Sequence, residues 1–166
     1  MLSVAIPTKA GVFVAQYSRR GLARLGFPHT TKPPQGAANQ LEGEVSEWHT
    51  LTVEALNRML SGQRPQALPP LDISAGTEFQ QAVWRGMLRI DFGRTCSYGQ
   101  LAAAIGRPKA VRALGGACGA NPIPVLIPCH RVLAAQRGLG GFGGGLDWKR
   151  KLLALEGSAF RERHSA

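Results

Sequence analysis

Two short motifs in the second half of the chain predict where two helices start. Thr77 and Ser97 are each followed three residues later by a glutamine, Gln80 and Gln100. In this capping box, the hydroxyl and the glutamine side chain satisfy backbone amides that lack a partner in the first helical turn. Pro108 then suits the first turn of a third helix. Short helices joined by a tight turn in a basic segment are typical of a helix-turn-helix.

The first half of the chain has strand patterns instead. Three short runs separated by turn signals predict a small antiparallel sheet: residues 3–6, 12–16 and 22–27. A helix with one apolar face follows. Segment 63–70 holds three prolines and is expected to be an extended linker, so we place a domain boundary near residue 72.

These patterns predict an α+β protein with two domains. Residues 1–72 are expected to form an N-terminal α/β domain, a small antiparallel β-sheet plus a helix, with the proline-rich linker at its end. Residues 73–166 are expected to form a helical, winged helix-turn-helix-like domain that carries the active site.

The net charge of +10 lies mostly in the second half. Residues 1–72 carry 7 basic and 5 acidic side chains, whereas residues 73–166 carry 13 and 5, a net charge of +8. A concentrated positive field favours a polyanionic partner, nucleic acid first, and a basic protein without such a partner is the alternative. No apolar run is long enough to span a membrane and no signal peptide is recognised, so we expect a cytoplasmic protein without membrane contacts.

The helix expected over residues 108–119 has two faces. Val111, Leu114 and Cys118 recur at helical spacing and should pack inward, which makes Cys118 a structural residue. Arg112 and three glycines share a neighbouring stripe. Each glycine weakens a helix by up to about 1 kcal/mol, so another surface should lie close against the stripe. That surface is either the protein's own next element or DNA, with Arg112 projecting toward it.

A cysteine with two basic neighbours follows an apolar run, in the order Cys129-His130-Arg131. Such neighbours favour the nucleophilic thiolate, so Cys129 is the candidate reactive residue. The alternative is a core cysteine at the end of a strand over residues 125–127. Because side chains alternate along a strand, His130 would reach the thiol only if the chain turns at Pro128 or a water molecule bridges the two.

Two observations bear on cofactors. The three cysteines, Cys96, Cys118 and Cys129, form no C-x-x-C pair, which argues against a disulfide framework and a zinc site. Segment 138–145 contains six glycines and suits a loop whose backbone approaches a ligand. The segment lacks the lysine and hydroxyl residue of a phosphate loop, so no nucleotide cofactor is expected.

Glu156 stands in the final turn of a helix expected to run from about Asp147 to a stop at Gly157. The helix dipole disfavours an anion at that end. Glu156 is therefore either used elsewhere, for example in orienting His130, or simply solvated.

Together these residues resemble the O6-alkylguanine-DNA alkyltransferases, also called methylated-DNA–protein-cysteine methyltransferases. The resemblance covers residues 77–157, and the order Pro-Cys-His-Arg is its most specific part. Its other motifs are Phe79-Gln80-Gln81-Ala82-Val83-Trp84, Ser97-Tyr98, Pro108 to Gly116, Asn121-Pro122, Gly143-Gly144-Gly145 and Leu152 to Gly157. Residues 1–72 resemble the variable N-terminal domain of that family.

The resemblance implies a direct-reversal DNA repair protein that binds double-stranded DNA containing O6-alkylguanine through the minor groove. Arg112 would fill the place of the nucleotide that is rotated out of the stack. The implied DNA-binding residues are Arg112, Ser97, Tyr98, Ala113, Gly115, Gly116 and Arg131. We expect a monomer, and cooperative assembly on DNA is left open.

The resemblance also implies roles in catalysis. Cys129 would attack the alkyl carbon, with His130 as the base acting through water and Glu156 orienting the imidazole. Asn121 would brace the active-site turn, and Tyr98 would assist phosphate rotation and polarise the guanine. The implied base pocket consists of Tyr98, Pro124, Val132, Phe142 and Gly143.

The implied enzyme is a methylated-DNA–protein-cysteine S-methyltransferase that acts once, because the thioether product is stable. No cofactor and no metal are expected, and activity on O4-alkylthymine is left open. Two other functions remain as alternatives. One is a helix-turn-helix regulator or lesion sensor without transfer, and the other is a cysteine hydrolase with a Cys-His-Glu arrangement.

Overall fold

The computed structural model describes residues 1–35 and 41–162. The chain forms two compact units, which we call the sheet unit and the helical unit. The sheet unit comprises Met1–Ala75 and Pro122–Leu126, and the helical unit comprises Gly76–Asn121 and the chain from Ile127 onward. The chain first leaves the sheet unit close to the boundary expected near residue 72. The return of residues 122–126 to that unit was not predicted.

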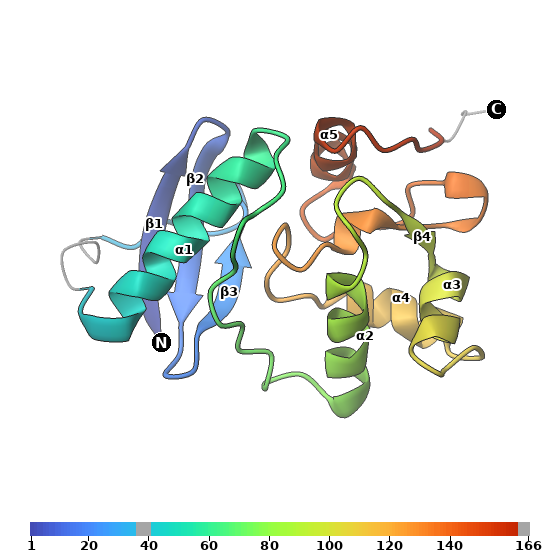
Figure 1. The fold of residues 1–166 in the computed structure, drawn as a ribbon, viewed down its shortest axis with the longest axis horizontal. Coiled ribbons are helices and arrows are strands. Elements are labelled where there is room, and N and C mark those ends of the chain that lie inside the picture. Colours follow the sequence, from blue (N-terminus) through green and yellow to red (C-terminus); the bar gives the residue numbers. More distant parts are fainter. Residues whose placement is uncertain (36–40, 163–166) are drawn as a thin grey trace. The chain divides into compact units, whose positions relative to one another are not determined.

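The sheet unit contains an antiparallel sheet in the order β1 (Leu2–Thr8), β2 (Gly11–Tyr17) and β3 (Leu22–Gly26), together with helix α1 (Gly43–Leu60). Figure 1 shows α1 lying across this sheet. The buried residues of α1 recur at helical spacing: Thr52, Ala55, Leu56, Met59 and Leu60. The hydroxyl of Tyr17 on β2 lies 3.0 Å from Nδ1 of His49 on α1, which adds a polar contact to this packing.

Segment 122–126 belongs to the core of the sheet unit. The backbone amide of Leu25 donates to the carbonyl of Pro122 at 2.9 Å, and Ile123 and Val125 are at most 1% exposed. The segment is not a strand, because Val125 has a φ of +74° and the prolines in and after it cannot donate to a ladder. The apolar run is therefore buried in an irregular conformation.

The helical unit contains α2 (Glu78–Leu88), α3 (Tyr98–Ala104), α4 (Val111–Gly119) and α5 (Leu146–Leu155). Strands β4 (Cys96–Ser97) and β5 (Val132–Leu133) form a short parallel pair. Both predicted capping boxes are present at the starts of α2 and α3. The small antiparallel sheet with its helices confirms the predicted α+β fold class.

Helix α4 packs against α2 through its later turns. The indole Nε1 of Trp84 donates to the carbonyl of Ala117 at 2.9 Å, and Leu114 and Cys118 are buried. The expectation that Val111 packs inward was wrong, because Val111 is 40% exposed. It occupies the first turn of α4, before the part of the helix that contacts α2.

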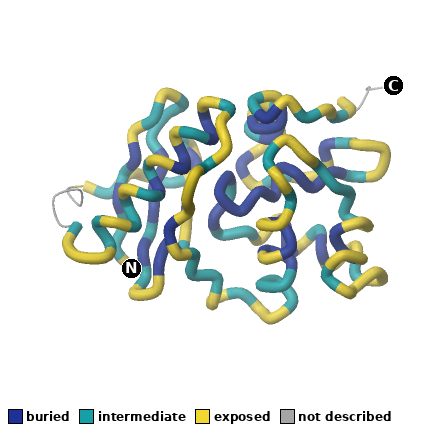
Figure 2. The backbone as a smooth tube through the Cα atoms, in the orientation of Figure 1, coloured by how far each residue is buried: buried dark blue, intermediate teal, exposed yellow. Residues whose placement is uncertain are grey.

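Residues 125–133 are buried without interruption, and the backbone coloured by burial in Figure 2 includes this stretch. The predicted nucleophile therefore lies in the interior of the fold. Within the described ranges, no helix is both long enough and apolar enough to cross a membrane.

Candidate active site

Cys129 lies in a tight turn rather than in a strand. Residues Cys129–Arg131 form the 3-10 turn η2, and the amide of Cys129 donates to the carbonyl of Ile127 at 2.8 Å. Nδ2 of Asn121 donates to the same carbonyl at 2.8 Å, and the Asn121 side chain also hydrogen-bonds to the thiol. The turn after Pro128 removes the alternation expected for a strand, so the side chains of Cys129 and His130 are not forced to opposite faces.

His130 forms a buried pair with Glu156. Nε2 of His130 lies 2.8 Å from Oε1 of Glu156, and the two side chains are 0% and 1% exposed. Burial lowers the pKa of His130 from its usual value and outweighs the opposing effect of Glu156, so the imidazole is neutral. Because Glu156 is ionised and has no proton to donate, the proton must lie on Nε2. Nδ1 then carries the lone pair, and it has no hydrogen-bond partner among the described residues.

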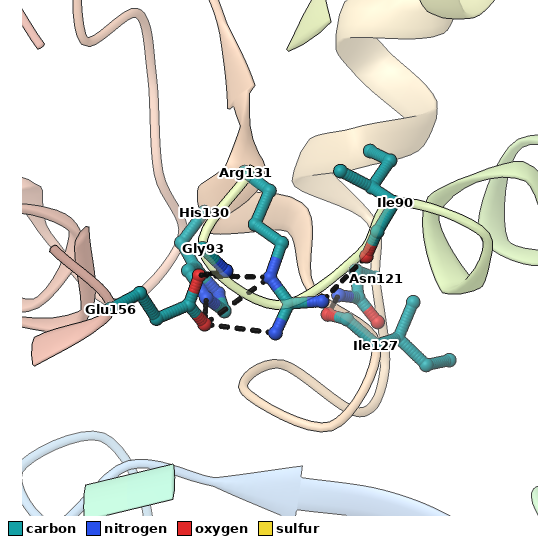
Figure 3. A network of polar contacts seen from close by, with 7 residues as sticks. All are labelled: Ile90, Gly93, Asn121, Ile127, His130, Arg131 and Glu156. Atoms are coloured by element: carbon teal, nitrogen blue, oxygen red, sulfur yellow. Dashed lines mark hydrogen bonds and ion pairs between the residues drawn. The ribbon is translucent and has the colours of Figure 1, made fainter. Parts of the chain in front are cut away.

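Arg131 holds the other side of Glu156 (Figure 3). Its Nε donates to Oε2 and its Nη2 to Oε1, both at 2.9 Å, and its Nη1 donates to the carbonyl of Ile90 at 2.6 Å. Burial alone would raise the pKa of Glu156, but the hydrogen bonds from His130 and Arg131, together with the charge of Arg131, lower it to about 2. The sequence left open whether Glu156 is simply solvated, and the structure shows instead that it is buried between His130 and Arg131.

The DNA contact expected of Arg131 stays a prediction, and its side chain is bonded inside the protein. Its side chain is 8% exposed, and its guanidinium lies between the Glu156 carboxylate, the Ile90 carbonyl and the ring of Phe92, whose centroid is 5.6 Å away. All three guanidinium nitrogens thus already donate hydrogen bonds inside the protein. Arg131 therefore links the turn η2 to the Glu156 carboxylate and to the Ile90 carbonyl.

The Cys129 thiol is protonated in the resting protein. Burial raises its pKa to about 11, and the opposing contributions of Asn121, the charge of Lys149 and nearby backbone amides only partly offset this effect. The expected lowering by adjacent basic side chains does not occur, because Arg131 points to Glu156 and His130 is neutral. A reaction at this thiol therefore requires a base.

A cavity of about 480 Å³ opens beside the thiol. Besides Cys129, its lining includes three residues of the predicted base pocket, namely Tyr98, Phe142 and Gly143, while Val132 and Pro124 are not part of it. Val132 is fully buried, and Pro124 belongs to the sheet unit. The remaining lining residues are Gly115, Cys118, Gly119 and Gly141. Burial, together with the thiols of Cys118 and Cys129, raises the pKa of Tyr98 to about 12, so its phenol remains a hydrogen-bond donor.

The comparison with known proteins agrees with this geometry. The model of the 6-O-methylguanine DNA methyltransferase DNA-binding domain matches residues 78–158. The crystal structure of Mycobacterium tuberculosis OGT in complex with DNA superposes with a TM-score of 0.77 at 36% identity, over 93% of this chain and 91% of that chain. The chain belongs to the O6-methylguanine DNA methyltransferase family.

Curated members of this methyltransferase family match part of the chain. The Haemophilus influenzae methylated-DNA–protein-cysteine methyltransferase is 59% identical over 49% of this chain and 45% of its own length. The Mycobacterium bovis protein of the same name is 48% identical over 64% of each chain. The chain thus aligns with about half to two thirds of the length of these relatives.

In this methyltransferase-family chain, one face of α4 is open. Arg112, Ala113 and Gly116 are exposed and Gly115 is partly exposed. A Cβ added at Gly115, Gly116 or Gly119 would meet no described atom within 4 Å. The protein's own packing therefore does not explain the glycines, which favours a partner that approaches the backbone closely. Ser97 uses its hydroxyl to cap α3, accepting from the amide of Gln100 at 3.0 Å.

Lys149 was not predicted from the sequence. Its side chain on α5 is 0% exposed, and Nζ donates to the carbonyls of Val132 at 2.8 Å and Gly141 at 3.3 Å. Burial lowers the pKa of Lys149 to about 8, against the influence of the thiols of Cys129 and Cys118. The only signal in the sequence was a lysine on the apolar side of the last helix, four residues before Leu153.

Cys118 was expected to be structural, and the structure adds a second feature. Its sulfur lies 3.8 Å from that of Met87 in the core, yet the residue also lines the cavity with Cys129. Burial and the neighbouring Cys129 raise the pKa of Cys118 to about 12. No group of three or more potential metal ligands occurs among the residues that the structure describes.

Proposed function

We propose that this protein repairs O6-alkylguanine in DNA by transferring the alkyl group to Cys129. The observation that carries the proposal is the Cys129 thiol at the wall of a 480 Å³ cavity, directly before a buried His130–Glu156 pair. The members of the family named above are methylated-DNA–protein-cysteine methyltransferases, which agrees with this chemistry.

His130 acts as the general base of the transfer. Nδ1 carries the lone pair and takes the thiol proton through a bridging water molecule, and Glu156 stabilises the imidazolium that forms. Asn121 and the ammonium of Lys149 favour the thiolate, since both lower the pKa of Cys129. The base thus acts on a thiol that is neutral until substrate is bound.

The thiolate then attacks the alkyl carbon in line with the bond to O6. A sulfur–carbon bond forms, the carbon–O6 bond breaks, and its electron pair stays on the guanine. The phenol of Tyr98, which is protonated at neutral pH, donates a hydrogen bond to the leaving base. Guanine takes up one proton for the one that the thiol lost, so it leaves as a neutral base. The thioether has no route back to a thiol, and each chain therefore acts once.

Duplex DNA is bound along the open face of α4. Arg112 enters the minor groove and fills the space of the nucleotide that is rotated into the cavity, while Ala113, Gly115 and Gly116 allow the helix backbone to approach. The net charge of +8 on residues 73–166 supports the electrostatic part of the binding. The protein acts as a monomer on a single lesion, in the cytoplasm.

The direct test is to mix the protein with a duplex oligonucleotide carrying one O6-methylguanine and to weigh the intact chain and its Cys129 peptide. We expect the mass of one methyl group on Cys129, saturating at one equivalent. DNA binding without a mass gain would instead indicate a lesion sensor or regulator, and repeated turnover of a small ester would indicate a hydrolase.

A further inference from the structure

The segment that follows α5 returns to the glycine-rich loop. The backbone amide of Arg161 donates to the carbonyl of Arg137 at 2.7 Å, and Arg161 forms a parallel bridge with Gly138. We call residues 158–162 the strap. Its backbone is therefore paired with the start of the loop that lines the cavity beside Cys129.

Phe160 anchors the strap in apolar contacts. Its ring packs against a small cluster made of Leu133, Leu139 and Leu153, which are at most 6% exposed. Leu133 lies on β5, Leu153 lies on α5 and Leu139 lies in the loop itself. The Phe160 side chain thus connects the loop to β5 and α5, the two elements that follow the turn η2 and support it.

An ion pair closes the far end of the strap. Oε1 of Glu162 accepts from Nε of Arg150 at 2.6 Å, and both residues line a second cavity of about 380 Å³. The other lining residues of that cavity are Leu139, Gly140, Gly141 and Leu146. Gly141 also lines the cavity that holds Cys129, so the loop is a thin wall with the strap contacts on one side and the site on the other.

The wall has little stiffness of its own. It contains six glycines between residues 138 and 145, and glycine loses more conformational freedom on ordering than any other residue. At Gly140, φ is +67° and an added Cβ would lie 2.9 Å from the Tyr98 hydroxyl. A residue with a side chain, which would restrict the backbone more, is therefore not tolerated there. Contacts from outside the loop must therefore hold it.

We propose that Phe160 and Glu162 are positioning residues that hold loop residues 139–141 as the wall of the alkyl-base pocket. The inference rests on the proposed transfer to Cys129 and extends it to residues with no contact to the thiol. Loss of the strap leaves Cys129, His130 and Glu156 in place and loosens the surface against which the guanine must be aligned.

The test uses the full chain with Phe160→Ala, Phe160→Leu and Glu162→Gln. Phe79→Ala is the matched control, because Phe79 is also partly buried in the helical unit and lines neither cavity. Four quantities are measured: the limiting rate of methyl transfer from excess duplex DNA, the affinity for that DNA, labelling of Cys129 by iodoacetamide without DNA, and hydrogen exchange of peptides from residues 138–145.

Phe160→Ala should lower the limiting transfer rate about 10-fold, since misplacement of a binding surface costs rate even far from the reacting atoms. Iodoacetamide labelling and DNA affinity should change less than about twofold, and exchange in the loop should accelerate. Phe160→Leu should restore most of the rate. Glu162→Gln should change it less than about threefold, because an exposed ion pair contributes little.

A transfer rate and loop exchange equal to those of the parent in Phe160→Ala would overturn the inference. If Phe160→Ala does not fold, the milder truncation Phe160→Val replaces it. Faster exchange of residues 138–145 than in the parent then supports the inference, and parental exchange overturns it. If the parent itself transfers no methyl group, the proposed function fails, whereas loop exchange still decides whether the strap holds the loop.

Discussion

Nε2 of His130 lies 2.8 Å from Oε1 of Glu156, in a pair that is almost completely withdrawn from solvent. The contact joins the turn η2, which holds Cys129, to the end of α5. It also orients the imidazole so that Nδ1 carries the lone pair. The same carboxylate accepts from Arg131, so a single acidic side chain sets the orientation of two consecutive basic ones.

Glu156→Gln should slow methyl transfer about 10- to 100-fold, because a neutral amide does not stabilise the imidazolium that forms at His130. Single-turnover rates on methylated duplex DNA measure the effect. Asp147→Asn on the same helix is the matched control, since the Asp147 side chain is fully exposed. Equal rates for Glu156→Gln and the parent would remove Glu156 from the base relay.

The stability of the protein should fall in acid through Glu156. Its pKa is lowered to about 2 in the folded state, whereas in the unfolded chain it has its usual value of 4.5. Its contribution is therefore complete above about pH 5 and is lost as the pH falls toward 2. The shift corresponds to roughly 3 kcal/mol. Denaturant unfolding between pH 7 and 3 should show a smaller acid loss in Glu156→Gln, and parallel curves would contradict this assignment.

Lys149→Met should raise the pKa of Cys129 further, because it removes the buried positive charge that lowers that pKa in the parent. Iodoacetamide labelling of Cys129 as a function of pH should shift to higher pH, and methyl transfer at neutral pH should slow about 10-fold. Lys151→Met is the matched control, because Lys151 lies on the same helix but is exposed. A shift of the same size in both variants would show that total charge matters rather than the position of Lys149.

The two cavity cysteines should behave differently. Cys129→Ala should abolish methyl transfer and keep DNA affinity. Cys118→Ala should transfer at a rate within about threefold of the parent, because Cys118 packs against Met87 in the core and, unlike Cys129, is not followed by a histidine that could remove its proton. Peptide mass spectrometry after reaction locates the methyl group. A methyl group on Cys118 would refute the assignment of the acceptor.

Arg112→Ala should impair transfer from duplex DNA about 10- to 100-fold while changing DNA affinity only a few-fold, since the side chain compensates for unstacking rather than for most of the binding. A single-stranded oligonucleotide carrying the same lesion needs no such compensation and serves as the control substrate. Equal losses on both substrates would show that Arg112 acts in general binding and not in nucleotide rotation.

The elements of the fold that depend on local chemistry were predictable from the sequence. Each capping box lies within four consecutive residues, so the starts of α2 and α3 are set by groups that are always near one another. The strands of the sheet and the helical pattern of α1 follow from side-chain periodicity in the same way. The inward packing predicted for Val111 was wrong, because periodicity shows which residues share a face of a helix but not how far along that helix a packing neighbour extends.

In the candidate site, too, local sequence predicted some residues and tertiary structure decided the others. The order Cys129-His130-Arg131 indicated Cys129 as the candidate nucleophile and His130 as its candidate base, because the three residues are adjacent. Tertiary structure alone decided that Glu156, 26 residues beyond His130, is its partner rather than a solvated side chain. It also turned Arg131 inward and placed the buried ammonium of Lys149 on the carbonyl of Val132. Local sequence determines which chemical groups a segment contains. The packing of distant segments determines which of these groups are buried away from water and must therefore pair with one another.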